Sequence, residues 1–291
     1  MKFKTFSIAA GSEACNARCP FCVSKMTPKN GVDMKEPEVN WRNFKIAARL
    51  AKQTGIETAM ITSKGEPTLF PGQITKYLDA LAEFEFPFIE LQTNGIPIAE
   101  KRDKYDQFIR EWYKMGLTMP AISIVHYDQE KNRQIYLPHK EKYIDLPELV
   151  SYLHNVGFSV RLACVAVDGF IDNKGELEKL IEFARENKVE QLTVRPVNKP
   201  EKSINFEAYE WTKNHHLKPT QLEEIKGYLN RNGTGLLELP HGGTVYDING
   251  QNVCLTNSLT RDTDPEKGRQ LIFFPDGRIR YDWEKEGAIL L

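Results

Sequence analysis

Cysteine and long apolar runs are both scarce in this chain of 291 residues. It has five cysteines, and such a small, odd number argues against a framework of paired disulfides. No apolar run approaches the ~20 residues that a membrane-spanning helix requires. The first residues, MKFKTFSIAAG, have neither the apolar length nor the cleavage site of a signal peptide. We therefore expect a cytoplasmic protein whose thiols stay reduced.

An excess of charge of either sign is also absent. The 39 basic and 40 acidic residues leave a net charge of −1, so no overall field attracts polyanions, which disfavours bulk nucleic acid as a partner. The 41% hydrophobic and 27% charged content is typical of a globular protein. The length suits one large α/β domain with an appended part, or two domains.

What cysteine there is gathers in one place. Three of the five lie in the stretch CNARCPFC, at Cys15, Cys19 and Cys22, directly after an apolar run that ends at Gly11. Thiolates this close together are typical of iron–sulfur or zinc ligation. A cluster held only by protein, or a closed zinc site, takes four ligands. Three thiolates therefore leave one metal position for a ligand that is not protein.

The stretch CNARCPFC resembles the CxxxCxφC signature of radical S-adenosylmethionine (radical SAM) enzymes, including the aromatic Phe21 before the last cysteine. The resemblance implies that the three thiolates hold a [4Fe–4S] cluster whose fourth iron is chelated by the amino and carboxylate groups of SAM. A motif of this kind needs its structural context to be confirmed.

Two other interpretations of the motif stay open at this point. Positions 15, 19 and 22 also share one face of a helix, where three buried thiols would be inert. Pro20 argues against that helix, because it removes a backbone donor and clashes with the preceding turn. The stronger rival is a zinc site completed by Cys164, Cys254 or a histidine.

The rest of the first two thirds alternates between strand and helix patterns. Helical apolar spacing indicates helices over 41–53, 74–84, 103–115, 146–155, 175–187 and 220–230, and apolar runs indicate strands over 6–10, 57–62, 87–92, 121–125, 159–167 and 191–197. This alternation predicts right-handed crossovers and a parallel sheet. The resemblance implies an α/β fold, a partial (β/α)6 TIM-like barrel with a small β-rich C-terminal appendage.

Distinctive motifs follow the predicted strands, at the edge where parallel-sheet folds carry out their chemistry. SKGEP follows the second strand and QTNG the third. SKGEP stands in the place of the family's GGE motif, with Lys64 where the first glycine is usual, and implies contact between Glu66 and the SAM amino group. Each motif also has the simpler interpretation of a turn.

Four further residues on later strands have weaker assignments. The resemblance places Ser123 and Arg161 near the SAM ribose and carboxylate and the backbone around Val194 near adenine. For Arg161 a structural salt bridge is an equal alternative, because an unpaired interior charge is costly. Arg195 could face substrate. His126 follows the fourth strand, and we expect it to be a satisfied polar residue. The proposed cofactor-contacting set is thus Phe21, Gly65, Glu66, Asn94, Ser123, Arg161 and Val194.

The last third changes character. We place a core barrel over 1–198 and, over 199–291, the sixth helix and a β-rich extension that closes one edge of the barrel. Residues 199–218 have no clear periodicity, whereas LIFFPDGRIRYDW predicts a hairpin. That hairpin resembles part of the SPASM or Twitch extension, but two remaining cysteines cannot fill a second four-cysteine site. Substrate contacts are expected in 199–262, which contains His215, His216, His241, Tyr246 and Arg261.

The resemblance implies an enzyme that reductively cleaves SAM to a 5′-deoxyadenosyl radical, which abstracts hydrogen from a small metabolite, nucleotide or peptide. No catalytic residue beyond the cofactor contacts can be assigned. An electron donor such as flavodoxin or ferredoxin would reduce the cluster, and no membrane partner is expected. The rival function is a non-catalytic iron–sulfur or zinc protein that senses redox state or binds a partner.

Overall fold

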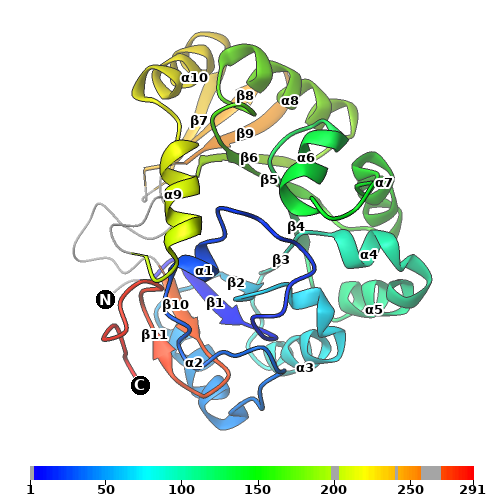
Figure 1. Cartoon of the computed structure of the whole chain (residues 1–291). Helices are drawn as coiled ribbons and strands as arrows, with labels where there is room; N and C mark the ends of the chain where they lie inside the picture. Colours follow the sequence, from blue (N-terminus) through cyan, green and yellow to red (C-terminus); the bar gives the residue numbers. More distant parts are fainter. Residues whose placement is uncertain (1–2, 198–202, 240–241, 257–269) are drawn as a thin grey trace.

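The computed structural model describes residues 3–197, 203–239, 242–256 and 270–291. Six parallel strands form the centre of one curved sheet: β1 (Thr5–Ala9), β2 (Thr58–Thr62), β3 (Phe88–Thr93), β4 (Met119–Ile124), β5 (Arg161–Ala166) and β6 (Gln191–Pro196). Figure 1 shows this sheet curving around an interior, with helices on its outer side. The predicted partial α/β barrel is confirmed.

Five crossover helices cover the outside of the sheet: α2 (Trp41–Gln53), α3 (Pro71–Ala82), α5 (Arg102–Lys114), α7 (Leu146–Val156) and α8 (Lys174–Glu186). Helix α2 shows why these helices pack on the sheet. Its apolar face consists of residues that recur at helical spacing and are all fully buried: Phe44, Ala47, Ala48 and Ala51. Asn40 begins this helix by accepting a hydrogen bond from the Asn43 backbone N–H. Burial of this outer layer of side chains holds helices and sheet together.

The two faces of the strands differ in exposure. Side chains that point toward the helices are buried, as Ile122 and Ile124 are on β4. On the opposite face Gln92, Ser123 and Thr193 are half-buried, whereas Ser7, Glu90 and Val165 are buried. Because successive strand residues alternate between faces, several polar side chains line the interior of the barrel.

Short elements occupy the loops at the carboxyl ends of the strands. They are α1 (Val23–Met26), the single 3₁₀ turn η1 (Pro67–Leu69), α4 (Ile96–Glu100) and α6 (Gln129–Tyr136). After β6 come α9 (Phe206–Asn214) and α10 (Pro219–Asn232), the latter close to the predicted sixth helix. The expected boundary at residue 198 falls outside the described residues.

The C-terminal strands extend the sheet at both edges, in the order β11-β10-β1-β2-β3-β4-β5-β6-β9-β8-β7. Strands β7 (Thr234–Glu238), β8 (Thr244–Ile248) and β9 (Gln251–Leu255) lie beyond β6, and β10 (Gln270–Phe273) and β11 (Ile279–Arg280) lie beyond β1. The antiparallel pairing of β10 with β11 confirms the predicted hairpin. The expectation of additions at a single edge was incomplete, because β9 and β10 each pair in parallel with an outer strand of the barrel.

Helix α9 lies within residues 199–218, where the sequence shows no clear periodicity. Only Ala208 and Thr212 of this helix are buried, so the apolar periodicity that reveals a helix is nearly missing. The signal that was present is Asn205, whose side chain accepts a hydrogen bond from the Ala208 backbone N–H and begins the helix. Among the described residues, no helix is long and apolar enough to cross a membrane.

Candidate functional site

The three clustered cysteines lie on an irregular loop between the end of β1 and the start of α1. Cys15 is exposed, while Cys19 and Cys22 are half-buried. Because residues 11–22 form no helix, the interpretation of three inert thiols on one helical face is wrong. The loop instead presents the thiols at the carboxyl edge of the sheet.

The electrostatics of these thiols suit a positively charged metal centre. Although the surface of Cys15 is exposed, desolvation of its thiol raises its pKa to about 12, and the nearby Glu66 and Cys22 add to the shift. Burial also raises the pKa of Cys19 well above its ordinary value, with Cys22 and Cys15 contributing. The thiols are therefore close enough to oppose one another's ionisation, and bound cationic iron would stabilise all three thiolates.

A single zinc ion fits the site less well. Among the described residues, no group of three His, Cys, Asp or Glu side chains is arranged to hold one metal ion. Cys164 is fully buried on β5, and Cys254 lies on β9. The zinc site considered as an alternative is therefore not formed among the described residues. In a four-iron cluster each thiolate binds a different iron, so the three sulfurs need not lie close enough to share one ion.

Gly65 lets the second strand's loop pass against the cysteine loop. A Cβ atom at this position would lie 2.1 Å from the backbone oxygen of Ala14, the residue before Cys15. The next residue, Glu66, donates its backbone N–H to the same oxygen at 2.9 Å. Glycine is required here because the two backbones are in direct contact.

The Glu66 carboxylate ties the end of β2 to the end of β3. It is 2% exposed and accepts hydrogen bonds from the backbone N–H and hydroxyl of Thr68, the hydroxyl of Thr93 and the backbone N–H of Asn94. Burial raises the pKa of Glu66, and these hydrogen bonds oppose the shift. Since both oxygens accept hydrogen bonds from this chain, the carboxylate acts first as a brace within the site.

Asn94 extends this brace to the cysteine loop. Its amide nitrogen donates to Oδ1 of Asn16 at 2.9 Å and lies 4.0 Å from Sγ of Cys15. Its side-chain oxygen accepts from the Ile96 backbone N–H. The following Gly95 has a φ of 71°, a left-handed conformation that glycine adopts without strain. The TNG turn therefore holds a polar amide beside the first cysteine.

Lys64, the departure from the usual motif, is buried beneath the same loop. It is 4% exposed, and its Nζ donates to Oγ1 of Thr27 at 2.7 Å. Burial lowers the pKa of Lys64 to about 8, whereas the charges of Glu13 and Cys22 act in the opposite direction. A buried cation therefore lies near the last cysteine.

The three residues assigned on later strands have different environments. Ser123 is half-buried on the interior face of β4, as a ligand contact would require. Arg161 is the first residue of β5, toward the edge opposite the cysteines, and its guanidinium pairs with Glu90 and Gln191. The alternative of a structural salt bridge thus accounts for Arg161. The Val194 carbonyl accepts the Thr256 backbone N–H at 3.0 Å, which uses one of its two lone pairs.

Arg195 and His126 lie in two different environments. Arg195 is the next-to-last residue of β6 and faces the barrel interior. Burial lowers its pKa, and within the described residues its guanidinium has neither a hydrogen bond nor an ion pair. The charge of Cys19 raises the pKa of Tyr136 and the charge of Arg195 lowers it, which places the arginine near the cysteine loop. His126 is buried between the Asp128 backbone N–H and the Glu176 carboxylate, as expected for a satisfied polar residue.

Helix α9 supplies a side chain that the sequence reasoning missed. Trp211 packs on Phe21 with ring centroids 5.7 Å apart, and the His215 ring stacks on the indole with centroids 3.9 Å apart. Phe21 therefore closes the cysteine loop against a helix rather than facing open solvent. Of the other residues expected to contact substrate, Tyr246 bonds to Asn230 on α10, whereas His241 and Arg261 lie outside the described residues.

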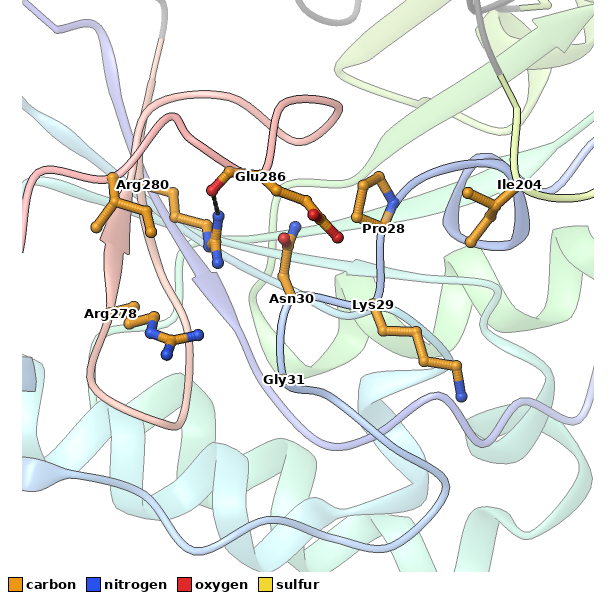
Figure 2. Close-up of a pocket in the computed structure, with 9 residues that line it drawn as sticks. Pro28, Lys29, Asn30, Gly31, Ile204, Arg278, Arg280 and Glu286 are labelled. Atoms are coloured by element: carbon orange, nitrogen blue, oxygen red, sulfur yellow. Dashed lines mark hydrogen bonds between the residues drawn. The ribbon is translucent and has the colours of Figure 1, made fainter.

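A cavity of about 660 Å³ lies apart from the cysteines, at the edge formed by the C-terminal hairpin. Figure 2 shows Asn30 at its centre, with Arg278 and Arg280 on one side and Pro28 and Ile204 on the other. The Arg280 guanidinium donates to the Glu286 backbone oxygen across this space. None of the thiols lines it, so this cavity and the cysteine site are separate features.

A family model and several solved structures resemble this chain. The family model described as the radical SAM superfamily matches residues 11–184. No curated protein matches the chain in sequence.

Solved structures share the fold at low identity. SuiB from Streptococcus suis bound to S-adenosylmethionine is 17% identical, with a TM-score of 0.61 over 96% of this chain and 60% of SuiB. The protein anSMEcpe with bound AdoMet is 14% identical, with a TM-score of 0.58 over 95% of this chain and 74% of its own length. The Escherichia coli coproporphyrinogen III oxidase HemN is 12% identical, with a TM-score of 0.51 over 81% and 54%. The chain thus spans about 60% of the length of SuiB.

Proposed function

The chain belongs to the radical SAM superfamily, and from that premise we propose that it is an enzyme that binds one [4Fe–4S] cluster through Cys15, Cys19 and Cys22. SAM would complete the site. The observation that supports the proposal is the location of all three thiols on one irregular loop, against which the SKGEP backbone packs. When bound, the cluster supplies the electron that splits SAM into methionine and a 5′-deoxyadenosyl radical, which abstracts hydrogen from substrate.

The chain's own residues would orient these groups. Glu66 fixes the ends of β2 and β3 relative to each other, and Asn94 places its amide beside Cys15. Gly65 brings backbone against the cysteine loop, where the family's GGE motif meets the SAM amino group. Such second-layer contacts set the position of metal ligands and the electrostatics around them.

Water must be kept from the radical, and helix α9 contributes to this. Trp211 covers Phe21 on the cysteine loop, and Thr212 lies 4.0 Å from the sulfur of Met26 at the end of α1. A helix seated on the loop in this way limits access of solvent to the thiols. We propose that α9 closes the side of the site that the barrel strands leave uncovered.

The interior of the barrel suggests the substrate class. Several inward side chains are polar, among them Ser123 and Thr193, and Arg195 offers a cation without a partner among the described residues. A buried charge is stable when paired with an opposite charge. The proposed substrate is therefore a small organic molecule, nucleotide or peptide carrying a carboxylate or phosphate that meets Arg195.

A low-potential one-electron donor of the flavodoxin or ferredoxin class and a reducing, cytoplasmic environment complete the proposal. The test is anaerobic reconstitution with iron and sulfide, followed by dithionite and SAM. The wild-type chain should hold about four irons and release 5′-deoxyadenosine, and Cys15→Ala, Cys19→Ala and Cys22→Ala should each abolish the release. Cys254→Ala is the matched control and should retain it. A loaded cluster with no SAM cleavage would instead favour the redox sensor.

A further inference from the structure

Lys64 is a buried cation whose charge has no counter-ion in the described part of the chain. Its ammonium donates to Oγ1 of Thr27 at 2.7 Å and lies 3.5 Å from the Thr27 backbone oxygen, and no carboxylate lies within ion-pair distance of it there. The carboxylate whose charge acts most strongly on it is that of Glu13, which is already paired with the exposed Lys29 at 3.0 Å. A buried ammonium without an anion is costly, so a missing anion is implied.

The position of Lys64 identifies that anion. Thr27, the acceptor for Lys64, donates its hydroxyl to the carbonyl of Val23, the residue after Cys22. The charge of Cys22 also acts on Lys64. Lys64 thus lies behind the last cysteine, at the end of the short helix α1 that starts there. Three thiolates and a four-iron core carry net negative charge, which grows by one unit when the core accepts an electron.

We propose that Lys64 is a positioning residue whose fixed positive charge, held behind Cys22, balances the thiolate-bound cluster and raises its reduction potential. This inference rests on the proposed function and concerns a residue that stands where the motif normally has glycine. The reduced cluster has the larger negative charge, so a nearby cation stabilises it more than the oxidised form. Reduction by an external one-electron donor adds one electron, and no bond in the protein changes.

The size of the effect follows from charge and burial. At an effective dielectric constant of about 20 and a separation on the order of 10 Å, one unit charge shifts the one-electron equilibrium about ten-fold. A ten-fold change in the ratio of reduced to oxidised cluster corresponds to about 59 mV for one electron. An exposed lysine at a similar separation has a smaller effect, because water screens it.

The experiment is a redox titration of the reconstituted protein, followed by the electron paramagnetic resonance signal of the reduced cluster, with iron content and thermal unfolding measured in parallel. Lys64→Met and Lys64→Gln should move the midpoint to more negative potential by about the stated amount, whereas Lys64→Arg should stay near the wild type. Thr27→Val keeps the Lys64 charge but removes the hydroxyl that accepts its hydrogen bond, so the midpoint potential should also stay near the wild-type value. Lys25→Met, which removes an exposed cation near the same cysteines, is the matched control and should shift the midpoint little.

Two results would overturn the inference. One is a wild-type midpoint in Lys64→Met and Lys64→Gln proteins that carry a full cluster. The other is an equal shift in Lys64→Met and Thr27→Val, which would assign Lys64 a role in packing alone. Failure of the proposed function looks different, because the wild-type chain itself would then take up no cluster or cleave no SAM.

Discussion

Replacing Gly65 with alanine tests whether backbone contact with SKGEP positions the cysteine loop. The added Cβ would lie 2.1 Å from the Ala14 oxygen and 2.7 Å from the backbone carbons of Ala14 and Glu13. These atoms are backbone, and the hydrogen bonds from Glu66 N to Ala14 and from the Ser63 hydroxyl to Ser12 keep them in place. The loop must therefore move by about 1 Å, at a cost of about 1–3 kcal/mol for overpacking of this kind.

The expected result is a lower urea midpoint for the cluster-free protein and a SAM-cleavage rate reduced by about a hundred-fold, since displacement of about 1 Å in a positioned group has that scale of effect. Gly72→Ala is the matched control. Gly72 is exposed in the first turn of α3 with nothing within 4 Å of an added Cβ, so alanine there should stabilise by up to ~1 kcal/mol. Equal stability, iron content and cleavage rate in Gly65→Ala and Gly72→Ala proteins would refute the reasoning.

Three further changes probe the remaining contacts. Burial raises the pKa of Glu66 above 4.5, so its contribution to the unfolding free energy is full below pH 4.5 and declines as pH rises through the folded-state pKa. Glu66→Gln should flatten that decline in urea titrations of the cluster-free protein. An unchanged pH profile of the unfolding free energy would count against this role of Glu66. Asn94→Ala should weaken cluster retention against a chelator by about 10–100-fold, with a wild-type rate of iron loss as the contrary outcome. Arg161→Met should destabilise the fold by about 1–3 kcal/mol, because the buried Glu90 loses its charged partner and keeps only the hydrogen bond from Gln92. SAM affinity measured by calorimetry should stay unchanged, and a large loss of affinity would return Arg161 to the cofactor site.

Local periodicity explains why much of the fold was predictable. Helix α2 begins and ends at the predicted residues, because its buried side chains recur at helical spacing and Asn40 caps it. Helix α9 lacks that spacing, with two buried residues, and its place on the cysteine loop depends on the packing of Trp211 on Phe21. No local pattern in the chain encodes such a contact.

The same contrast holds for the candidate site. The cysteine spacing and the motifs after β2 and β3 are local, and the structure brings Cys15, Gly65 and Asn94 together. The assignment of Arg161 depended on which end of its strand it occupies, and the predicted strand began two residues before β5 does. The link from Lys64 to Thr27 joins loops 37 residues apart and depends on tertiary packing.

The most direct measurement of the central claim is electron–nuclear double resonance on the reduced, reconstituted protein, with SAM isotopically labelled at its amino nitrogen and carboxylate oxygen. Three cysteine ligands leave one iron for SAM, so the labels should couple to the cluster spin in the wild-type chain. Absence of coupling from a fully loaded cluster would show that a fourth protein ligand, or none, occupies that iron, and would contradict the account.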